Sequence, residues 1–459
     1  MEDKEIESLI KKQKDFFYSG KTYNVEFRKV WLKRLYEEIV KSEQEIYDAL
    51  KKDLGKSSYE SYMCEVGMVL SEITYMLKNV KKLSKEQRVK TSFSQVPAKC
   101  YKKPSPYGVV LVMSPWNYPF LLSIGPMVDA LAAGNTVVLK PSAYSPNTSS
   151  VVSNIIKKVF NEEYVAVVEG GRKENAGLLK QDFNFVFFTG GQTVGKEVLR
   201  NTAEKLIPAV LELGGKSPCI IDKTANISVA AKRVVFGKYL NCGQTCIAPD
   251  YVLVDKTIKD EFLEKAIEEI KEQYGENAFN NVNYGKIINE KHFERISALI
   301  DKNKVVYGGE EKRESLQISP TIMDNVSELD AIMQEEIFGP ILPILTFDNI
   351  DEVIRGLSNK PKPLALYLFS QDKENISKIK ERCLFGGGCI NDTIIHIATT
   401  EMGFGGVGES GMGSYHGKTG FETFSHYKSI VEKDTKIDLK IRYQPYGKNY
   451  ESLVKRVLK

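Results

Sequence analysis

The chain has 459 residues, too many for one small domain, and its 42% hydrophobic fraction is typical of a folded protein rather than a disordered one. Its 64 basic and 60 acidic residues nearly cancel to a formal net charge of +4, which gives no support to nucleic-acid binding. The seven cysteines are scattered and odd in number, which argues against a disulfide framework and favours a reducing compartment.

The predicted elements begin with helices over the first 85 residues. Leu35 and Ile39 lie at helical spacing, and Gly55 suits the end of a helix. A second helical run covers residues 59–83. The residues that follow, 86–106, include β-type and turn residues and few apolar ones, so we expect an extended excursion outside the main core.

From residue 107 onward, short apolar strands alternate with helices. Strands are expected at 107–113, 135–140, 164–170 and 183–190, and in a second series at 217–222, 251–255, 341–347, 364–370 and 386–392. This alternation predicts parallel sheets covered by helices on both faces, with ligands at the carboxyl ends of the strands. The glycine-rich tail from about residue 401 has no short repeat and is expected to form an ordered loop.

The uncharged stretch 104–128 resembles a membrane span in composition alone. Its prolines would break a spanning helix, so we expect a strand, a turn and a helix instead. The charged start of the chain lacks the apolar core of a signal peptide, and its last residues carry no hydrophobic anchor. We therefore expect a cytoplasmic protein with no membrane anchor and no nucleic-acid partner.

A glycine-rich turn follows one predicted strand, in the sequence FFTGGQTVGKE. Its glycines at 190, 191 and 195 open a helix, whose free backbone N–H groups can hold a phosphate. The stretch nearly matches the P-loop of ATPases and kinases, but Glu197 stands where a Ser or Thr must bind magnesium. That carboxylate would also repel a nucleotide phosphate, so the P-loop hypothesis is rejected. A plain strand-to-helix turn remains the alternative to phosphate binding.

Cys246, in NCGQTCIAP, is a candidate nucleophile, although a lone cysteine more often serves as a buried structural residue. A reactive cysteine needs a base within reach, and no histidine lies nearby in the sequence. The candidate base is Glu212, which follows an apolar strand and precedes two glycines in LELGGKSP. Burial there would raise its pKa toward the range useful for a base. A helix-capping or salt-bridged glutamate is the alternative.

Two further motifs carry candidate ligand contacts. Asn117 lies in SPWNYP between proline turns, where its amide could donate to a developing oxyanion, and a turn-forming role is the alternative. Glu336, in EEIFGP, could accept hydrogen bonds from a ribose, and Phe338 could pack on a flat ring. A helix end stopped by the following glycine and proline is the alternative. No spacing of cysteines and histidines predicts a metal site.

Taken together, these motifs resemble one family. PWNYP, VVLKPS, FTGGQTVG, LELGGKSP, CGQTC, EEIFGP and GFGGVGESGMG occur in that order along the chain. The sequence resembles the aldehyde dehydrogenase superfamily along essentially its whole length. NCGQTCIAPDY and GSYHGKTGFETFSH most resemble the class 3 and fatty aldehyde dehydrogenase branch.

The resemblance implies an α/β fold with two parallel-sheet domains and a small β bridging element. The Rossmann-like cofactor-binding domain would comprise residues 1–85 and 107–210, and the catalytic domain residues 211–400. The bridging, oligomerisation element would comprise residues 86–106 and 415–440. By analogy with class 3 relatives, we expect a homodimer.

The resemblance also implies NAD(P)-dependent oxidation of aldehydes to carboxylic acids. In the family, the cysteine that matches Cys246 attacks the aldehyde, and the oxyanion of the thiohemiacetal is held by the residue that matches Asn117 and by the nucleophile's own backbone N–H. Hydride passes to the nicotinamide and leaves a thioester, and the match to Glu212 then activates water. The residues implied to bind the cofactor are Trp116, Lys140, Ser142, Ala143, Gly190, Gly191, Gln192, Thr193, Val194, Gly195, Glu336 and Phe338.

The sequence departs from the family at two positions. Ala143 stands where many members carry a glutamate that binds the ribose 2′-hydroxyl and repels a 2′-phosphate, so we expect NAD or NADP as cofactor, with NADP accepted. Gly403 replaces the usual proline near the substrate tunnel, which weakens any inference about the substrate. Apolar and aromatic residues near Tyr118 and Phe120 suit medium or long aliphatic or aromatic aldehydes.

Three rival functions remain open at this point. A CoA-acylating aldehyde dehydrogenase would replace water with CoA, but such enzymes generally lack the glutamate found here at position 212. A non-catalytic binding protein on the same scaffold would not need the intact set of Cys246, Glu212 and Asn117. A cysteine hydrolase would need no nicotinamide.

Overall fold

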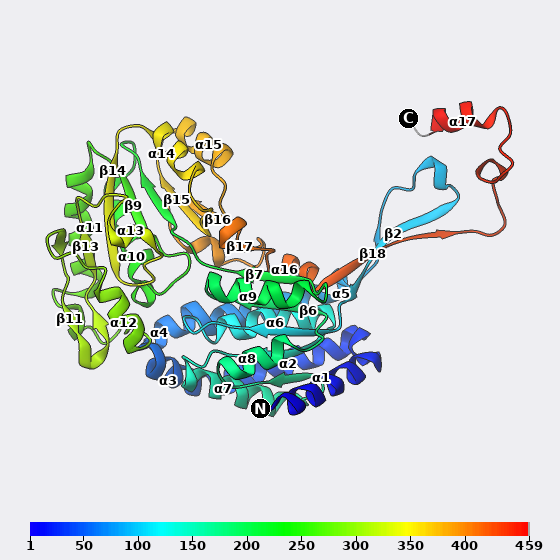
Figure 1. Cartoon of the computed structure of the whole chain (residues 1–459), viewed down its shortest axis with the longest axis horizontal. Helices are drawn as coiled ribbons and strands as arrows, with labels where there is room; N and C mark the ends of the chain where they lie inside the picture. Colours follow the sequence, from blue (N-terminus) through cyan, green and yellow to red (C-terminus); the bar gives the residue numbers. More distant parts are fainter. Residues whose placement is uncertain (458–459) are drawn as a thin grey trace.

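The computed structural model describes residues 1–457 (Figure 1). Over these residues the chain forms a six-stranded sheet, a seven-stranded sheet, a three-stranded sheet and a two-stranded ribbon. We call the first two the N-terminal sheet and the C-terminal sheet, and the third, which projects away from the body in Figure 1, the arm. The predicted α/β class is confirmed.

The N-terminal sheet has the strand order β17-β7-β6-β3-β4-β5 and is parallel except for β17 at its edge. Its strands are β3 (Val109–Met113), β4 (Thr136–Lys140), β5 (Val165–Val167), β6 (Phe185–Thr189), β7 (Ala209–Glu212) and β17 (Gly411–Met412). Its helices are α1 (Asp3–Tyr18), α2 (Val25–Lys41), α3 (Glu43–Leu54), α4 (Ser58–Ser61), α5 (Gly67–Leu83), α6 (Leu121–Ala133), α7 (Pro146–Val159), α8 (Arg172–Leu179) and α9 (Gln192–Ala203).

The parallel strands of this sheet contain continuous apolar runs, as expected for a sheet that helices cover on both faces. On β3, Val110 and Val112 pack into a core with residues of α2, α5 and α6. Their neighbours Val109 and Leu111 point the other way, into a core with residues of α1, α8 and α9. Both faces of the strand are therefore buried, as its unbroken run of valine and leucine predicts. The predicted helix end at Gly55 is also confirmed, since this residue closes α3 with a left-handed φ of 73°.

The C-terminal sheet has the order β10-β13-β14-β9-β8-β15-β16, parallel except where β10 pairs with β13. Its strands are β8 (Pro218–Ile221), β9 (Tyr251–Asp255), β10 (Val305–Tyr307), β13 (Thr321–Met323), β14 (Ile341–Phe347), β15 (Ala365–Phe369) and β16 (Gly387–Ile390), and a ribbon of β11 (Glu311–Lys312) and β12 (Gln317–Ile318) lies apart. The helices of this region are α10 (Ile227–Tyr239), α11 (Lys259–Tyr274), α12 (Glu290–Ser297), α13 (Ala331–Gln334), α14 (Ile350–Ser358) and α15 (Lys373–Arg382). The sequence did not predict β10 and β13, whose three-residue runs are too short to show a pattern.

The arm pairs β2 (Ala98–Pro106) with β18 (Ser425–Lys433) along their whole lengths, and β1 (Gln87–Arg88) adds to its edge. Figure 1 shows the arm leaving the body, with α17 (Tyr450–Val457) at its far end. Between β17 and the arm, α16 (Gly417–Thr423) packs on α5 and α6. None of the helices in residues 1–457 is long and apolar enough to cross a membrane.

The glycine-rich tail is ordered, and two of its residues, Gly411 and Met412, join the N-terminal sheet as β17. Strand β17 pairs antiparallel with β7, placing Gly411 opposite Glu212. Gly411 has a φ of 142°, and a Cβ on it would lie 2.1 Å from the backbone oxygen of Leu211. Only a residue without a side chain allows this approach. The glycine therefore permits the last part of the chain to pass directly beside the end of β7.

Candidate active site

A cavity of about 530 Å³ is lined by residues from the regions of both the N-terminal sheet and the C-terminal sheet. Its walls come from the loops after β3, β6 and β7, from the loop between α10 and β9, and from residues near Glu336 and the glycine-rich tail. Of the predicted site residues, the lining includes Trp116, Asn117, Gly190, Gly191, Glu212, Cys246, Glu336 and Phe338. Residues far apart in the sequence thus meet around one space.

Cys246 lies in the loop between α10 and β9 and is partly exposed to the cavity. Burial raises the pKa of its thiol, and the nearby charges of Glu336 and Glu212 raise it further. The backbone N–H groups of Cys246 and Ile247 act in the opposite direction. The thiol of the unliganded protein is therefore protonated near neutral pH, and it must lose its proton before it can attack a carbon.

Glu212 ends β7 and is 2% exposed. Neither of its carboxylate oxygens has a hydrogen-bond partner among residues 1–457. Burial raises the pKa of this carboxyl well above its usual range, in the direction that the sequence predicted. A buried carboxyl without partners is costly to the fold, and such uncompensated groups are typical of functional sites.

Asn117 lies in the loop after β3 and is 3% exposed. Its side-chain Nδ2 donates a hydrogen bond to the backbone oxygen of Gln244, two residues before Cys246, at 3.0 Å. The second hydrogen of this amide remains for another acceptor. The amide is therefore fixed to the loop that carries the sulfur.

A buried ion pair, absent from the sequence predictions, holds the loop of Asn117. Lys56 and Glu65 are both fully buried, with Nζ and Oε1 2.6 Å apart. Lys56 Nζ also donates to the backbone oxygen of Asn117 at 3.0 Å. Glu65 Oε2 accepts from the backbone N–H groups of Phe120 and Leu121, at 2.8 and 3.1 Å, at the start of α6. The pair therefore fixes the loop at both ends.

The loop of Cys246 is hydrogen-bonded both internally and to the loop of Asn117. Asn241 Nδ2 donates to the backbone oxygens of Asn117 and Gln244, at 2.9 and 3.1 Å. Tyr118 and Thr245 share a hydroxyl hydrogen bond of 2.7 Å. Asn241 and the next residue both adopt a left-handed backbone, with φ of 51° and 52°. Such strain persists only where the surroundings hold it, and here the hydrogen bonds do so.

The predicted phosphate turn lies between β6 and α9. Gly191 is the N-cap of α9, and a Cβ added there would meet no atom of residues 1–457 within 4 Å. Gly195 serves packing instead, because a Cβ on it would lie 2.8 Å from the side chain of Leu213. The predicted residues Gln192, Thr193 and Val194 form the first turn of this helix, outside the lining of the cavity.

Three predicted cofactor residues, Lys140, Ser142 and Ala143, lie at or just after the end of β4 and do not line the cavity. Lys140 is 3% exposed, and its Nζ donates to the backbone oxygen of Pro141 at 2.7 Å. Burial lowers the pKa of Lys140 to about 8. Ser142 accepts a hydrogen bond from the backbone N–H of Tyr144, and Ala143 is exposed. β4 and β6 are parallel strands of one sheet, so both groups lie at its carboxyl edge.

Glu336 and Phe338 reach the cavity from the loop before β14. Burial, with the charge of Asp250, raises the pKa of Glu336 to about 8. A Cβ on Gly214 would lie 2.2 Å from Glu336 Oε2, so the glycine makes room for this carboxyl. The Phe338 ring meets the Trp116 ring edge-on, with centroids 5.4 Å apart. These groups form one wall of the cavity.

Residues that the sequence did not single out support this wall. Arg295 donates to the backbone oxygens of Glu336 and Ile337, at 3.4 and 2.7 Å. His292 packs on the Trp116 ring, with centroids 5.0 Å apart. Both come from α12, and neither stands in a recognisable motif. Their roles become visible only once the chain has folded.

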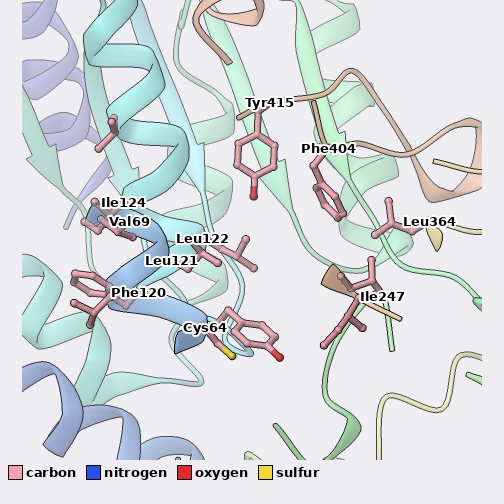
Figure 2. Close-up of a cluster of buried hydrophobic side chains, with 14 of the residues drawn as sticks. Cys64, Val69, Phe120, Leu121, Leu122, Ile124, Ile247, Leu364, Phe404 and Tyr415 are labelled. Atoms are coloured by element: carbon pink, nitrogen blue, oxygen red, sulfur yellow. The ribbon is translucent and has the colours of Figure 1, made fainter. Parts of the chain in front are cut away.

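The rest of the cavity is apolar. Its lining includes Met63, Met68, Tyr118, Leu121, Leu122, Phe236, Leu240, Ile394, Ile397 and Phe404. Phe120, which the sequence analysis associated with the substrate, does not line the cavity. It immediately precedes α6 and is fully buried in the core, away from Tyr415 and Phe404 in Figure 2. The expectation concerned apolar and aromatic residues near Tyr118 and Phe120, and of these Tyr118, Leu121 and Leu122 line the cavity.

Comparison with known proteins identifies the fold and the family. The sequence profile described as "Aldehyde dehydrogenase family" matches residues 1–430. The chain belongs to the aldehyde dehydrogenase family. It is 44% identical over 443 residues to the 4,4'-diaponeurosporen-aldehyde dehydrogenase of Staphylococcus aureus, covering 96% of each chain. It is also 40% identical over 452 residues to mouse aldehyde dehydrogenase family 3 member A2, covering 98% of this chain and 93% of the relative.

A solved structure agrees with these relatives. The substrate-bound state of Staphylococcus aureus AldH superposes with a TM-score of 0.97 at 43% sequence identity, covering 99% of both chains. The predicted class 3-like branch of the aldehyde dehydrogenases is therefore confirmed. This aldehyde dehydrogenase catalyses the NAD(P)-dependent oxidation of aldehydes.

Replacing Lys56 by Met should destabilise the enzyme and lower kcat more than it raises KM. Removing one partner of a buried pair costs about 3–5 kcal/mol, and the Asn117 loop loses its anchor. Thermal unfolding and steady-state kinetics test both effects. Lys12→Met, which removes a surface pair with Glu162, should change stability by less than about 1 kcal/mol. If folded Lys56→Met, or the double variant with Glu65→Gln, kept full kcat, the positioning role would be refuted.

Proposed function

We propose that Cys246 is the nucleophile of this aldehyde dehydrogenase, Asn117 an oxyanion donor and Glu212 the general base for hydrolysis. The observation that carries the proposal is that a thiol, a fixed amide and an unpartnered buried carboxyl line one cavity. Each group taken singly has a structural alternative. Their convergence beside an apolar space supports a chemical role.

The chemistry follows from the atoms of these residues. After the thiol of Cys246 has lost its proton to solvent, Sγ bonds to the aldehyde carbon, the carbonyl π bond breaks, and the carbon becomes tetrahedral with the negative charge on the former carbonyl oxygen. The free N–H of the Asn117 amide and the backbone N–H of Cys246 are the donors for that oxygen. In the second stage, water bonds to the acyl carbon, Glu212 takes its proton, and the bond from carbon to Sγ breaks to release the acid.

The residues of this chain fit a nicotinamide dinucleotide. When bound, the oxidised nicotinamide supplies the hydride acceptor and a positive charge. We propose that the turn of Gly190 and Gly191, which is open at Gly191, receives the pyrophosphate together with the first turn of α9. Lys140 would face the adenosine ribose, and Glu336 and Phe338 would face the nicotinamide ribose and ring. Trp116 would complete that wall.

We propose that the cofactor preference includes NADP, because the ribose site lacks a carboxylate at Ala143. The side chain at this position is exposed, next to the end of β4 that carries Lys140. A 2′-phosphate there meets no like charge from residue 143 and lies near a lysine. A curated relative from dog, "Aldehyde dehydrogenase, dimeric NADP-preferring", is 41% identical over 442 residues, which adds support.

We propose a medium or long apolar aldehyde as the substrate. The supporting observation is the methionine, leucine, isoleucine and phenylalanine lining beside Cys246. Apolar chains gain about 0.8 kcal/mol for each CH₂ buried in such a lining. The Staphylococcus aureus relative is itself named for an aldehyde, 4,4'-diaponeurosporen-aldehyde.

We also propose the domain roles that the family resemblance implies. Residues 1–85 and 107–210 would bind the cofactor, and residues 211–400 would carry the nucleophile. The segments 86–106 and 415–440, which contain the strands of the arm, would join two copies of the chain in a homodimer. A cytoplasmic location is proposed from the scattered, odd set of cysteines.

The catalytic roles predict different defects for two variants. Cys246→Ser should lower aldehyde oxidation by about 10³-fold or more, because the hydroxyl is a far weaker nucleophile. Glu212→Gln should still give one rapid equivalent of NAD(P)H and then stall as an acyl-enzyme, with hydrolysis slowed about 10²–10⁴-fold. Stopped-flow absorbance and intact-protein mass spectrometry would measure both.

The pH dependence of the wild-type enzyme should agree with the role of Glu212. Because the pKa of this carboxyl is raised, hydrolysis should fall as the pH drops through that pKa, since a protonated carboxyl cannot accept the proton of water. The product should be the free acid even with CoA present. Normal turnover by Cys246→Ser, or an acyl-CoA product, would contradict the proposal.

Ala143→Glu should lower kcat/KM for NADP relative to NAD by about 10-fold or more, which is about 1.4 kcal/mol. The introduced carboxylate repels the 2′-phosphate and accepts a hydrogen bond from the 2′-hydroxyl. Ala143→Gln is the matched uncharged control and should shift the ratio much less. A wild-type enzyme with a large preference for NAD would be inconsistent with this account of Ala143.

The proposed homodimer predicts a particle of about twice the 51.7 kDa chain mass in sedimentation equilibrium. A mass equal to one chain at micromolar concentration would refute the dimer.

A further inference from the structure

Tyr415 lines the cavity, but the catalytic roles described above do not use it. The residue is 1% exposed, and its hydroxyl has no hydrogen-bond partner among the residues that the structure describes. Figure 2 shows the hydroxyl pointing toward the space that Leu122, Phe404 and Ile247 surround. A buried hydroxyl left without a partner costs about 1–3 kcal/mol. Its orientation suggests a partner that enters the cavity during the reaction.

The hydroxyl lies close enough to Glu212 and Cys246 for their charges to affect its pKa. The pairing of β17 with β7 sets Gly411 opposite Glu212, and the chain reaches Tyr415 four residues later. Burial raises the pKa of Tyr415 well above its usual range, and the charges of Glu212 and Cys246 raise it further. Tyr415 therefore carries its proton as a neutral hydroxyl that can both donate and accept a hydrogen bond.

The ring of Tyr415 is fixed on several sides. It stacks on His416 with centroids 4.1 Å apart and meets Phe187 edge-on at 5.0 Å. Its backbone N–H and oxygen form two hydrogen bonds of 2.9 Å with Phe404. The hydroxyl thus has one defined position in the cavity.

The backbone beside Tyr415 is strained, and two buried carboxyls hold it. His416 has a φ of 84°, a conformation that costs a residue with a side chain about 1–3 kcal/mol. Glu72 accepts hydrogen bonds from the Gly417 backbone N–H at 2.8 Å and is paired with His416 Nδ1 at 3.3 Å. Asp129 Oδ2 accepts from the His416 backbone N–H at 3.4 Å. The fold thus maintains a strained turn next to this tyrosine.

The two carboxyls share one negative charge. Burial and the charge of Glu72 raise the pKa of Asp129 well above its usual range. Burial alone would also raise the pKa of Glu72, but hydrogen bonds from His416 and Asp129 lower it overall. Asp129 therefore holds a proton and Glu72 is ionised, the state that best accepts the N–H groups of the turn.

We propose that Tyr415 is a further catalytic residue, whose hydroxyl and the Glu212 carboxylate together hold the water that hydrolyses the Cys246 thioester. This inference rests on the proposed function. The phenol oxygen accepts a hydrogen bond from one O–H of the water, and Glu212 takes the proton of the other. The water oxygen bonds to the acyl carbon, the bond from carbon to Sγ breaks, and Cys246 leaves as a thiolate. Tyr415 gains and loses no proton.

The test separates formation of the acyl-enzyme from its hydrolysis. Without cofactor, p-nitrophenyl acetate transfers its acetyl group to Cys246 and releases nitrophenolate in a burst, after which water must release acetate. Stopped-flow absorbance gives both rates. Tyr415→Phe should keep the burst rate and amplitude within about twofold and slow the steady state about 10-fold, the effect of one lost hydrogen bond.

Tyr164→Phe is the matched control. Its hydroxyl is also buried and without a partner among residues 1–457, but it lies in the core of the N-terminal domain, away from the cavity. This control should leave both rates unchanged. Added hydroxylamine, a strong nucleophile that needs no positioning by a phenol, should restore turnover of Tyr415→Phe. A merely structural defect would not respond in this way.

Two results would overturn the proposal. One is unchanged hydrolysis in Tyr415→Phe, and the other is an equal loss of the burst and the steady-state rates, which would place the hydroxyl at the sulfur or the oxyanion instead. Failure of the underlying function is distinguishable, because it would appear in the wild-type enzyme as no acyl-enzyme at all, or in Glu212→Gln as normal hydrolysis.

Discussion

The geometry of the active site depends on two hydrogen bonds that meet at one backbone oxygen. Lys56 Nζ and Asn241 Nδ2 reach the carbonyl of Asn117 from different domains, at 3.0 and 2.9 Å. The first donor is balanced by Glu65, and the second also binds the backbone of Gln244, near Cys246. The oxyanion donor and the nucleophile are therefore positioned through a shared acceptor. Because charge-assisted hydrogen bonds are strong in a buried setting, small relative movements of the two domains are opposed at this point.

The electrostatics of the cavity complement this rigid frame. Cys246, Glu212 and Glu336 all have raised pKa values, and burial is the main cause for each. The two carboxyls would be ionised in neutral water, but only burial acts on the pKa of Glu212, and the charges of Lys216 and Arg295 offset the burial of Glu336 only in part. An entering cation would lower all three pKa values together. The unliganded site thus holds its acids in a neutral state, and a positively charged ring bound beside them would favour the ionised forms that the proposed roles of Cys246 and Glu212 require.

Much of this arrangement was predictable from local sequence. Apolar runs such as that of β3 predict buried parallel strands, because helices cover both faces, and Gly55 correctly predicted a helix end. The candidate site residues Cys246, Glu212 and Asn117 lie in short motifs with glycines or prolines that shape their loops. Each motif can therefore be recognised in the sequence. Their convergence on one cavity could not be derived from spacing, since more than a hundred residues separate Asn117 from Cys246.

The sequence could not show which charged and aromatic residues the fold would bury, or where their side chains would point. Lys56 and Glu65 resemble the many solvated charges of the N-terminal helices, and only the fold buries both. Phe120 and Tyr118 are two residues apart, just before α6, but the Phe120 ring lies in the core and the Tyr118 ring lines the cavity. In each case the deciding information is three-dimensional, because burial and direction depend on partners from other elements.

The tail shows how a late segment of the chain completes a site that earlier segments begin. β17 reaches the end of β7 because Gly411 allows backbone atoms to approach closely. The strained turn at His416 then directs the chain into α16, which packs on α5 and α6 before β18 enters the arm. Glu72 on α5 and Asp129 on α6 bind that turn directly. The residues that place Tyr415 in the cavity therefore also set the origin of the arm, so one set of buried carboxyl contacts fixes both the reaction site and the projecting strand.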